Sequence, residues 1–268
     1  MKNYKYKILV LSDLSKTASA TLKSSISLAN MIDAKIELFH VKQYIDIVDR
    51  DNQLSAMRTL NEEQNNTKKK VEELVNSVSK TYNTAIDYRF SFGNVKEEIK
   101  NYIKTSKPDI IVLGQRESKP FKLIGDSITR FVLKKFKGVI MISSNENALV
   151  PNEKMTLGVL NGSNKIFDKE FSKDIMTHTK APLKSFRILK GQKETTNTIG
   201  VNGEKMVEYV FEQNANAMTT LSSYLIKNNI NLLCVDRAKN KTKDTTNAEA
   251  PLKEVLSKLN VSLLVSEA

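Results

Sequence analysis

Two apolar segments of the sequence end in residues that could contact an anion. Asp13 closes the segment YKILVLSD, and Gly114 closes DIIVLG, which leads into QRESKPFKLIGDSI. A buried strand that passes through a glycine-containing loop into a helix is typical of a phosphate site, because free backbone N–H groups gather there. Glu117 and Asp126 oppose this interpretation, since their carboxylates carry the same sign of charge as a phosphate. The stretch therefore predicts an anion site with an altered loop.

Other chemistry has little support in the sequence. The two histidines, His40 and His178, and the single cysteine, Cys234, lie too far apart to form a metal-binding pattern. Neither a GxSxG turn nor a GxxxxGK[ST] loop is present, and the serines near the loop lack an evident base. We therefore expect a binding protein and not an enzyme.

Composition narrows the class further. The chain has 268 residues, of which 40% are hydrophobic and 27% charged, so it can build a core in one large or two ordinary domains. The net charge is +12, but the basic residues form no stripe with aromatics, which argues against nucleic acid as a partner. No segment approaches the ~20 apolar residues of a membrane span. One cysteine, set in the apolar run INLLCVD, predicts a buried side chain, and we expect a cytoplasmic protein.

The elements that must position these residues follow from hydrophobic periodicity. Apolar runs at 6–13, 34–41, 85–92, 109–114 and 139–143 predict strands, and helical spacing predicts helices near 15–32, 47–82, 93–107 and 127–136. This alternation indicates βαβ units and a parallel sheet. If strand order reverses between the first and fourth strands, Asp13 and Gly114 become neighbours that flank one crevice. The loop 115–126 would close over it.

The pattern then repeats. After the segment NENALVPNEK, which we interpret as a linker, strands are expected at 155–162 and 185–191. The segments that begin at Tyr88 and Tyr209 align without a gap, and Val132-Leu133 matches Val255-Leu256. The sequence therefore predicts two tandem α/β domains, 1–147 and 154–268. The second is reduced, because residues 191–204 offer a loop in place of the long helix at 47–82.

The segments VLSDLSKTASATLKSSISLANMIDAKIELFHV and PDIIVLGQR…GDSITRFVLKKFKGVIMI resemble the universal stress protein family in its tandem form. The resemblance covers residues 5–145 well and 155–268 in outline. It implies an adenine nucleotide α-hydrolase-like fold, with two open, parallel, five-stranded sheets that carry helices on both faces. It also implies an intramolecular pseudo-dimer that meets along the fifth strands, VIMIS and VSLLVS.

The resemblance also implies a set of nucleotide-binding residues. ATP-binding members carry Gly, two residues, Gly, nine residues, then Gly and Ser or Thr. Glu117 and Asp126 stand at the second and third glycine positions, and the loop is one residue short. Gly125 could substitute for the third glycine, and Arg116, with Lys119 and Lys122, could neutralise a triphosphate. The implied site, for ATP or a related adenine nucleotide with Mg²⁺, comprises Asp13, Val41, Gly114, Arg116, Gly125, Ser127 and Ile128.

In the second domain Asn161 stands in place of Asp13, and Val235 stands in place of Gly114. Glu249 and Ala250 stand where the first domain has Asp126 and Ser127. These replacements predict a domain that keeps the fold but has lost the site, with a structural or pairing role.

Three functions remain open at this point. The first is a sensor or adaptor of the stress response that contacts a protein partner and has at most slow hydrolysis of bound nucleotide. The second is a scaffold that binds a protein or another anion and whose nucleotide site is vestigial; Glu117 and Asp126 favour it. The third is an adenylyl-transfer enzyme, which the missing glycine signature opposes. Whether two chains associate further is also left open.

Overall fold

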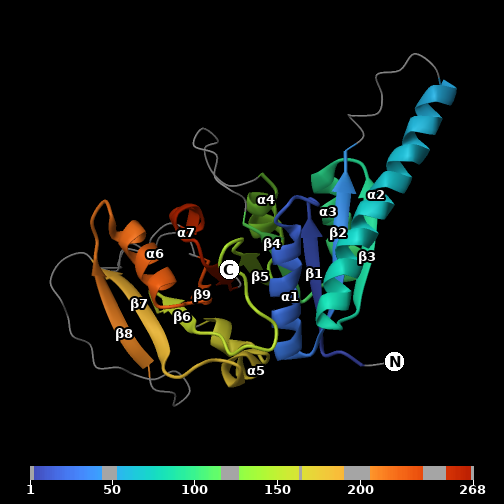
Figure 1. Cartoon of the computed structure of the whole chain (residues 1–268). Coiled ribbons are helices and arrows are strands. Elements are labelled where there is room, and N and C mark those ends of the chain that lie inside the picture. Colours follow the sequence, from blue (N-terminus) through green and yellow to red (C-terminus); the bar gives the residue numbers. More distant parts are fainter. Residues whose placement is uncertain are drawn as a thin grey trace.

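The computed structural model describes residues 3–43, 53–115, 127–162, 165–189, 206–237 and 252–266, and Figure 1 shows their arrangement. The elements of the first half are β1 (Tyr6–Ser12), α1 (Ala18–Ile32), β2 (Ala34–Lys42), α2 (Gln53–Tyr82), β3 (Ile86–Phe92), α3 (Val95–Ser106), β4 (Ile110–Gly114), α4 (Ser127–Lys135) and β5 (Val139–Ser143). Those of the second half are β6 (Leu157–Leu160), a 3₁₀ turn (Lys165–Asp168), α5 (Ser172–Thr177), β7 (Leu183–Leu189), β8 (Met206–Glu212), α6 (Ala217–Lys227), β9 (Leu232–Val235), α7 (Leu252–Lys258) and β10 (Ser262–Val265).

One ten-stranded sheet joins the two halves, with the order β3-β2-β1-β4-β5-β10-β9-β6-β7-β8. Pairing is parallel within each half, and each half has the same order when it is followed outward from the centre. β5 and β10 pair antiparallel, with Ile142 opposite Leu263. This confirms the α/β fold and the contact between fifth strands. The sheet fits two tandem domains, although the boundaries at 147 and 154 stay a prediction.

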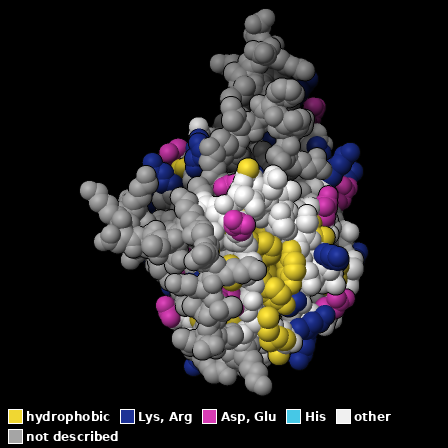
Figure 2. Space-filling model, turned by 90° about the vertical axis from the view of Figure 1, so that its left-hand side faces the viewer, with side chains coloured by type: hydrophobic (Ala, Val, Ile, Leu, Met, Phe, Trp, Pro, Cys, Tyr) yellow, Lys and Arg dark blue, Asp and Glu magenta, His cyan; other side chains and the backbone are white. Residues whose placement is uncertain are grey.

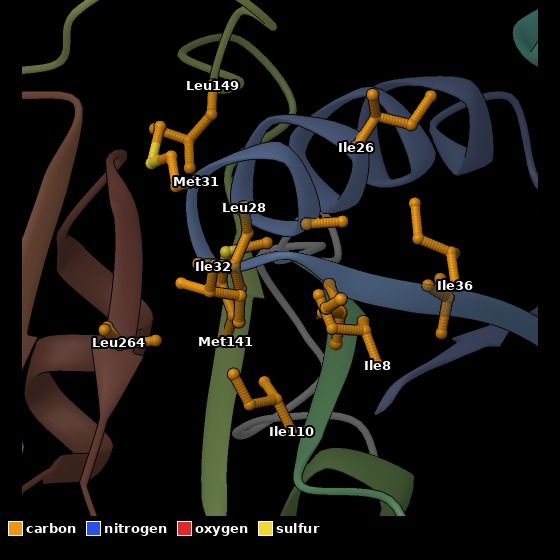
Figure 3. Close-up of a cluster of buried hydrophobic side chains, with 14 of the residues drawn as sticks. Ile8, Ile26, Leu28, Met31, Ile32, Ile36, Ile110, Met141, Leu149 and Leu264 are labelled. Carbon is orange, nitrogen blue, oxygen red and sulfur yellow. The ribbon is translucent and has the colours of Figure 1, made fainter. Parts of the chain in front are cut away.

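The core consists of two layers, one on each face of the sheet. Helices α1, α2 and α5 cover one face, and α3, α4, α6 and α7 cover the other. Alternate residues of each strand point to opposite faces, so a continuous apolar strand serves both layers. Figure 3 shows part of the α1 layer, where strand residues Ile8, Ile36, Ile110 and Met141 lie against Ile26 and Ile32 of α1.

Local signals explain the helices near the crevice. The Asn94 side chain accepts hydrogen bonds from the backbone N–H groups of Lys96 and Glu97, which caps α3. Lys107 ends α3 in the left-handed conformation, just before Pro108. The long helix expected at 47–82 is described from Gln53 onward as α2, and Figure 1 shows it running past the end of β2.

The segment that we interpreted as a linker is in part an ordered piece of the core. Leu149 is 2% exposed, and its backbone N–H donates to Ser24 Oγ of α1 over 3.0 Å. Beside it, the Ser144 N–H donates to Ser262 Oγ, and Asn147 Nδ2 donates to the carbonyl of Asn260. Polar composition concealed these contacts, because the polar groups bind partners that are distant in the sequence. We call the β5–β10 junction with these residues the seam.

The ungapped alignment of the two halves is wrong by one residue. It places buried Ile99 of α3 on Thr220, which is exposed, whereas Leu221 of α6 is the residue that packs on the same face. Val10 and Val159 likewise share the α1 face, so Asp13 corresponds to Gly162 and not to Asn161. By the same shift, Gly114 corresponds to Asp236 and not to Val235. A slip of one residue moves a strand residue to the opposite face, which is why burial decides the register.

The sheet ends at two edge strands, β3 and β8. Figure 2 faces the β8 end of the molecule, where hydrophobic side chains gather in a strip. Val207 and Val210 of β8 are 38% and 41% exposed, and Ile226 of α6 is 42% exposed. Within the described ranges, no helix is both long and apolar enough to span a membrane.

Candidate functional site

A cavity of about 420 Å³ lies beyond the carboxyl ends of β1, β2 and β4, in the first half. Four of the predicted site residues line it: Asp13, Val41, Gly114 and Ile128. The other lining residues are Leu11, Ser12, Thr17, Ala18, Thr21, Phe39, His40, Gln43, Val95, Ile99, Leu113 and Thr129. The expectation that Asp13 and Gly114 flank one crevice is therefore met, because strand order reverses between β1 and β4.

Asp13 sits in the turn between β1 and α1. Its Oδ1 accepts a hydrogen bond from the Ser15 N–H over 3.0 Å, and Leu14 N–H donates to Ser12 Oγ over 3.1 Å. Leu14 has a φ of 56°, in the left-handed region, so these bonds hold a tight turn. The turn fixes the carboxylate at the mouth of the cavity.

Gly114 ends β4 directly against α1. A Cβ at this position would lie 2.6 Å from Thr21 Oγ1, which is closer than nonbonded atoms approach. The next residue, Gln115, donates its backbone N–H to the Ser143 carbonyl of β5 over 2.7 Å. The absence of a side chain at Gly114 is thus accounted for by packing against Thr21, independently of any ligand.

His40 ties the end of β2 to the end of β1. Its Nδ1 lies 2.8 Å from the Ser12 carbonyl oxygen, and since a carbonyl only accepts, Nδ1 carries the hydrogen. Burial lowers the pKa of His40, against the opposing effect of this hydrogen bond, while Lys42 lowers it further. His40 is thus a hydrogen-bonded residue near the end of its strand. Its ring also lines the cavity, beside Val41.

The walls from α3 and α4 were not foreseen in full. Val95 and Ile99 of α3 give the cavity an apolar side, and Ile128 and Thr129 come from the first turn of α4. Sequence spacing predicted both helices but not which of their faces meets the crevice. The amphipathic pattern of α3 carried a usable signal, because Ile99 is the buried residue of that helix.

Part of the predicted loop lies outside the described residues. Arg116, Gly125, Glu117 and Asp126 belong to that part. Ser127 is the first residue of α4, which agrees with the expected helix start. In the part of the chain that the structure describes, no cluster of His, Cys, Asp or Glu could hold a metal ion.

The corresponding end of the second half is arranged differently. Gly162 stands where the first half has Asp13, so the carboxylate is missing. Asp236 stands in place of Gly114, and its Oδ1 accepts a hydrogen bond from Ser266 Oγ over 2.7 Å. Asn161 Oδ1 accepts from the Ile188 N–H over 3.0 Å. This end of the second half therefore carries other side chains than the crevice of the first half, and the loss of a site there stays a prediction.

Comparisons with known proteins agree with this architecture. The model of the universal stress protein family matches residues 5–142. A universal stress protein from Archaeoglobus fulgidus DSM 4304 superposes with a TM-score of 0.71 at 15% identity, covering 98% of this chain and 96% of that one. A functionally unknown protein from Pseudomonas aeruginosa PAO1 gives 0.56 at 12% identity, covering 97% and 92%. No curated protein matches the chain.

Proposed function

Since the chain belongs to the universal stress protein family, we propose that it binds ATP or a related adenine nucleotide in the crevice of its first half. Occupancy would change its contacts with a protein partner during the cytoplasmic stress response. The observation that carries the proposal is the cavity of about 420 Å³, whose walls combine Asp13, the end of β2 and the first turn of α4. Its size is within the range of small-molecule sites, about 300–1,000 Å³.

The chemistry of the walls suits the parts of a nucleotide. Apolar Val95 and Ile99 offer a surface for a flat base, with the Val41 backbone beside it at the end of β2. The Asp13 carboxylate accepts from the Ser15 N–H, and because a carboxylate has about four acceptor sites it could also accept from ribose hydroxyls. The first N–H groups of α4 have no partners within the helix and favour negative charge.

The described part of the crevice offers too few carboxylates to hold Mg²⁺ without the phosphates of a nucleotide. Asp13 is the one carboxylate among the described lining residues. Mg²⁺ commonly binds through one or two carboxylates and the phosphates of its substrate. We therefore infer that a metal would arrive with the triphosphate. The His40 ring donates through Nδ1 to Ser12, which leaves Nε2 as its acceptor, and we propose nucleotide binding with at most slow hydrolysis.

A second candidate is the scaffold with a vestigial site. The contact of Gly114 with Thr21 favours it, because that glycine is explained without a phosphate. Glu117 and Asp126 in the following loop point the same way, since their charge opposes a triphosphate. On this alternative the crevice would take a protein segment or a smaller anion.

Calorimetric titration of the full chain with ATP, ADP and AMP, with and without Mg²⁺, separates the two candidates. We expect micromolar affinity for wild type and about tenfold weaker binding for Asp13→Asn, which keeps an acceptor for Ser15 but removes the charge. Asp33→Asn, at the other end of α1, is the matched control and should bind as wild type. Absence of heat at millimolar ligand would rule out the nucleotide and leave the scaffold.

A further inference from the structure

Arg237 reaches from the second half into the first. It follows β9, is 7% exposed, and extends its guanidinium across the seam. Nη1 donates to the carbonyls of Phe136 over 2.5 Å and Leu133 over 3.3 Å, and Nη2 donates to the carbonyl of Gly138 over 2.6 Å. These three acceptors belong to the last turn of α4 and to the chain that leads into β5.

The last turn of a helix leaves carbonyl groups without partners inside the helix and carries partial negative charge. A buried cation that donates to them satisfies the acceptors and stabilises that end. α4 has nine residues, and its opposite end supplies Ile128 and Thr129 to the crevice. Because α4 is about two and a half turns long and its turns are joined by backbone hydrogen bonds, loosening its C-terminal end would also loosen the turn that lines the crevice.

A matching contact runs in the opposite direction. Gln115, which directly follows the crevice residue Gly114, donates from Nε2 to the Leu259 carbonyl in the second half over 2.8 Å. Under the corrected register Gln115 and Arg237 are equivalent positions, and Leu259 and Phe136 both lie just beyond the helices that precede the fifth strands. Each half therefore donates a side chain to the same place in the other.

We propose that the second half acts on the crevice, with Arg237 and Gln115 as positioning residues that hold α4 and the end of β4 in binding geometry. The inference rests on the proposed function, because the ligand is the nucleotide proposed above. The hydrogen-exchange test of the positioning needs no ligand and does not depend on that function. It gives the half that lost its own site a role in the affinity of the other half. By linkage, ligand in the crevice must strengthen the seam contacts as much as those contacts strengthen binding.

Hydrogen exchange of the full chain without ligand tests the positioning directly. In Arg237→Met, which keeps the length of the side chain but removes its donors, residues 127–136 should exchange about tenfold faster than in wild type. Arg237→Lys should recover part of the protection, since it restores the charge at the end of α4. Ser262→Ala is the control, because it weakens the same seam without contacting α4.

ATP titration of the same variants tests the effect on binding. We expect about tenfold weaker affinity for Arg237→Met, a smaller loss for Arg237→Lys and for Gln115→Ala, and wild-type affinity for Ser262→Ala. ATP should also slow exchange in residues 252–259 of wild type.

If Arg237→Met does not fold, exchange and ATP affinity are compared between wild type and Arg237→Lys instead. Wild-type exchange in 127–136 together with wild-type affinity in the Arg237 variants would overturn the inference. If wild type binds no ATP, the proposed function fails, and the exchange experiment alone judges the positioning role.

Discussion

The two halves of the molecule share a strand order but end their first strands differently. In the first half, β1 leads into Asp13, which lines the cavity, and the His40 ring beside it donates a hydrogen bond to the Ser12 carbonyl. In the second half, β6 leads into Asn161, whose side chain accepts from the backbone of β7 at Ile188. Both halves thus join the ends of their first and second strands by a side-chain hydrogen bond. In the first half His40 makes this bond and the Asp13 carboxylate lines the crevice, whereas in the second half Asn161 makes the bond.

The layers beneath these junctions differ as well. In the first half, Glu37 is buried on the α3 face and contacts Lys7 and the Tyr102 hydroxyl. The same face of the first half holds Phe39 stacked on Tyr102, with ring centroids 4.1 Å apart. In the second half the equivalent rings, Phe186 and Tyr224, meet edge to face at 6.0 Å, and Tyr209 is stacked on Phe186 at 5.6 Å. The two layers therefore share an aromatic pair, and they differ in the buried carboxylate of Glu37 and in the additional ring of Tyr209. Two halves with the same strand order can thus differ in buried charge while keeping the same aromatic contact.

The largest expected effect concerns the seam, where the halves share one core. Leu264 of β10 is fully buried, and Leu264→Ala should lower the free energy of unfolding by about 2–5 kcal/mol through the cavity it leaves. Because one sheet spans both halves, we expect a single unfolding transition in denaturant that shifts as a whole. Val210→Ala, on an exposed position of β8, should change stability by less than about 0.5 kcal/mol. Two separate transitions, only one of them shifted, would show that the halves are independent.

A second test asks why the first half has Gly114 where the second has Asp236. Gly114→Ala should cost about 1–3 kcal/mol, because the new Cβ would lie 2.6 Å from Thr21 Oγ1. Gly114→Ala/Thr21→Ala should recover most of that loss, with Thr21→Ala alone as the control, and thermal unfolding measures all three. If the double variant stays as unstable as the single one, the contact with Thr21 does not explain the glycine.

The third test addresses the junction of the second half. Asn161→Ala removes the acceptor for the Ile188 N–H and leaves a non-glycine, non-asparagine residue at a φ of 51°, so about 1–3 kcal/mol should be lost. Asn152→Ala is a matched control, since Asn152 also has a positive φ of 66° but is exposed. Its variant should lose about 1 kcal/mol in urea unfolding. Equal losses in both would mean that the side-chain tie at Asn161 contributes little.

Most of the fold could be predicted because its signals are local. Apolar runs and helical spacing gave the strands and helices, and the reversal of strand order brought Asp13 and Gly114 to one crevice. The register between the halves could not be read in the same way. An ungapped match of two sequences cannot reveal that they are offset by one residue. The offset becomes visible only in the structure, where Leu221 is buried and Thr220 is exposed.

The contacts across the seam were beyond sequence reasoning for a different physical reason. Arg237 and Gln115 each donate to backbone carbonyls in the other half. Because every residue has a backbone carbonyl, the identity of the accepting residue gives no sign of the contact. The segment NENALVPNEK was interpreted as a linker because its asparagines are polar, although Asn147 contacts Asn260 and Leu149 is buried. Polar residues whose partners are distant in sequence look like loop residues until the fold brings those partners together.

The smallest expected effect is a difference in pH dependence between the halves, since only the first uses a titrating ring for its junction. Burial lowers the pKa of His40 below the ordinary value of 6.5, so the folded protein disfavours the protonated ring. Lys42 and Lys70 disfavour the charge as well, whereas Asp13 and the Ser12 carbonyl favour it less strongly than burial opposes it. The stability from a neutral His40 is therefore complete above about pH 6.5 and is lost as pH falls through the lowered pKa.

His40→Gln, which can still donate to Ser12, should flatten the fall in melting temperature between pH 7.5 and pH 5. His178→Gln, at an exposed position, is the control and should not change that fall. Parallel melting curves for wild type and His40→Gln across that range would mean that the ring does not link the junction to pH, and the two halves would then differ in geometry alone.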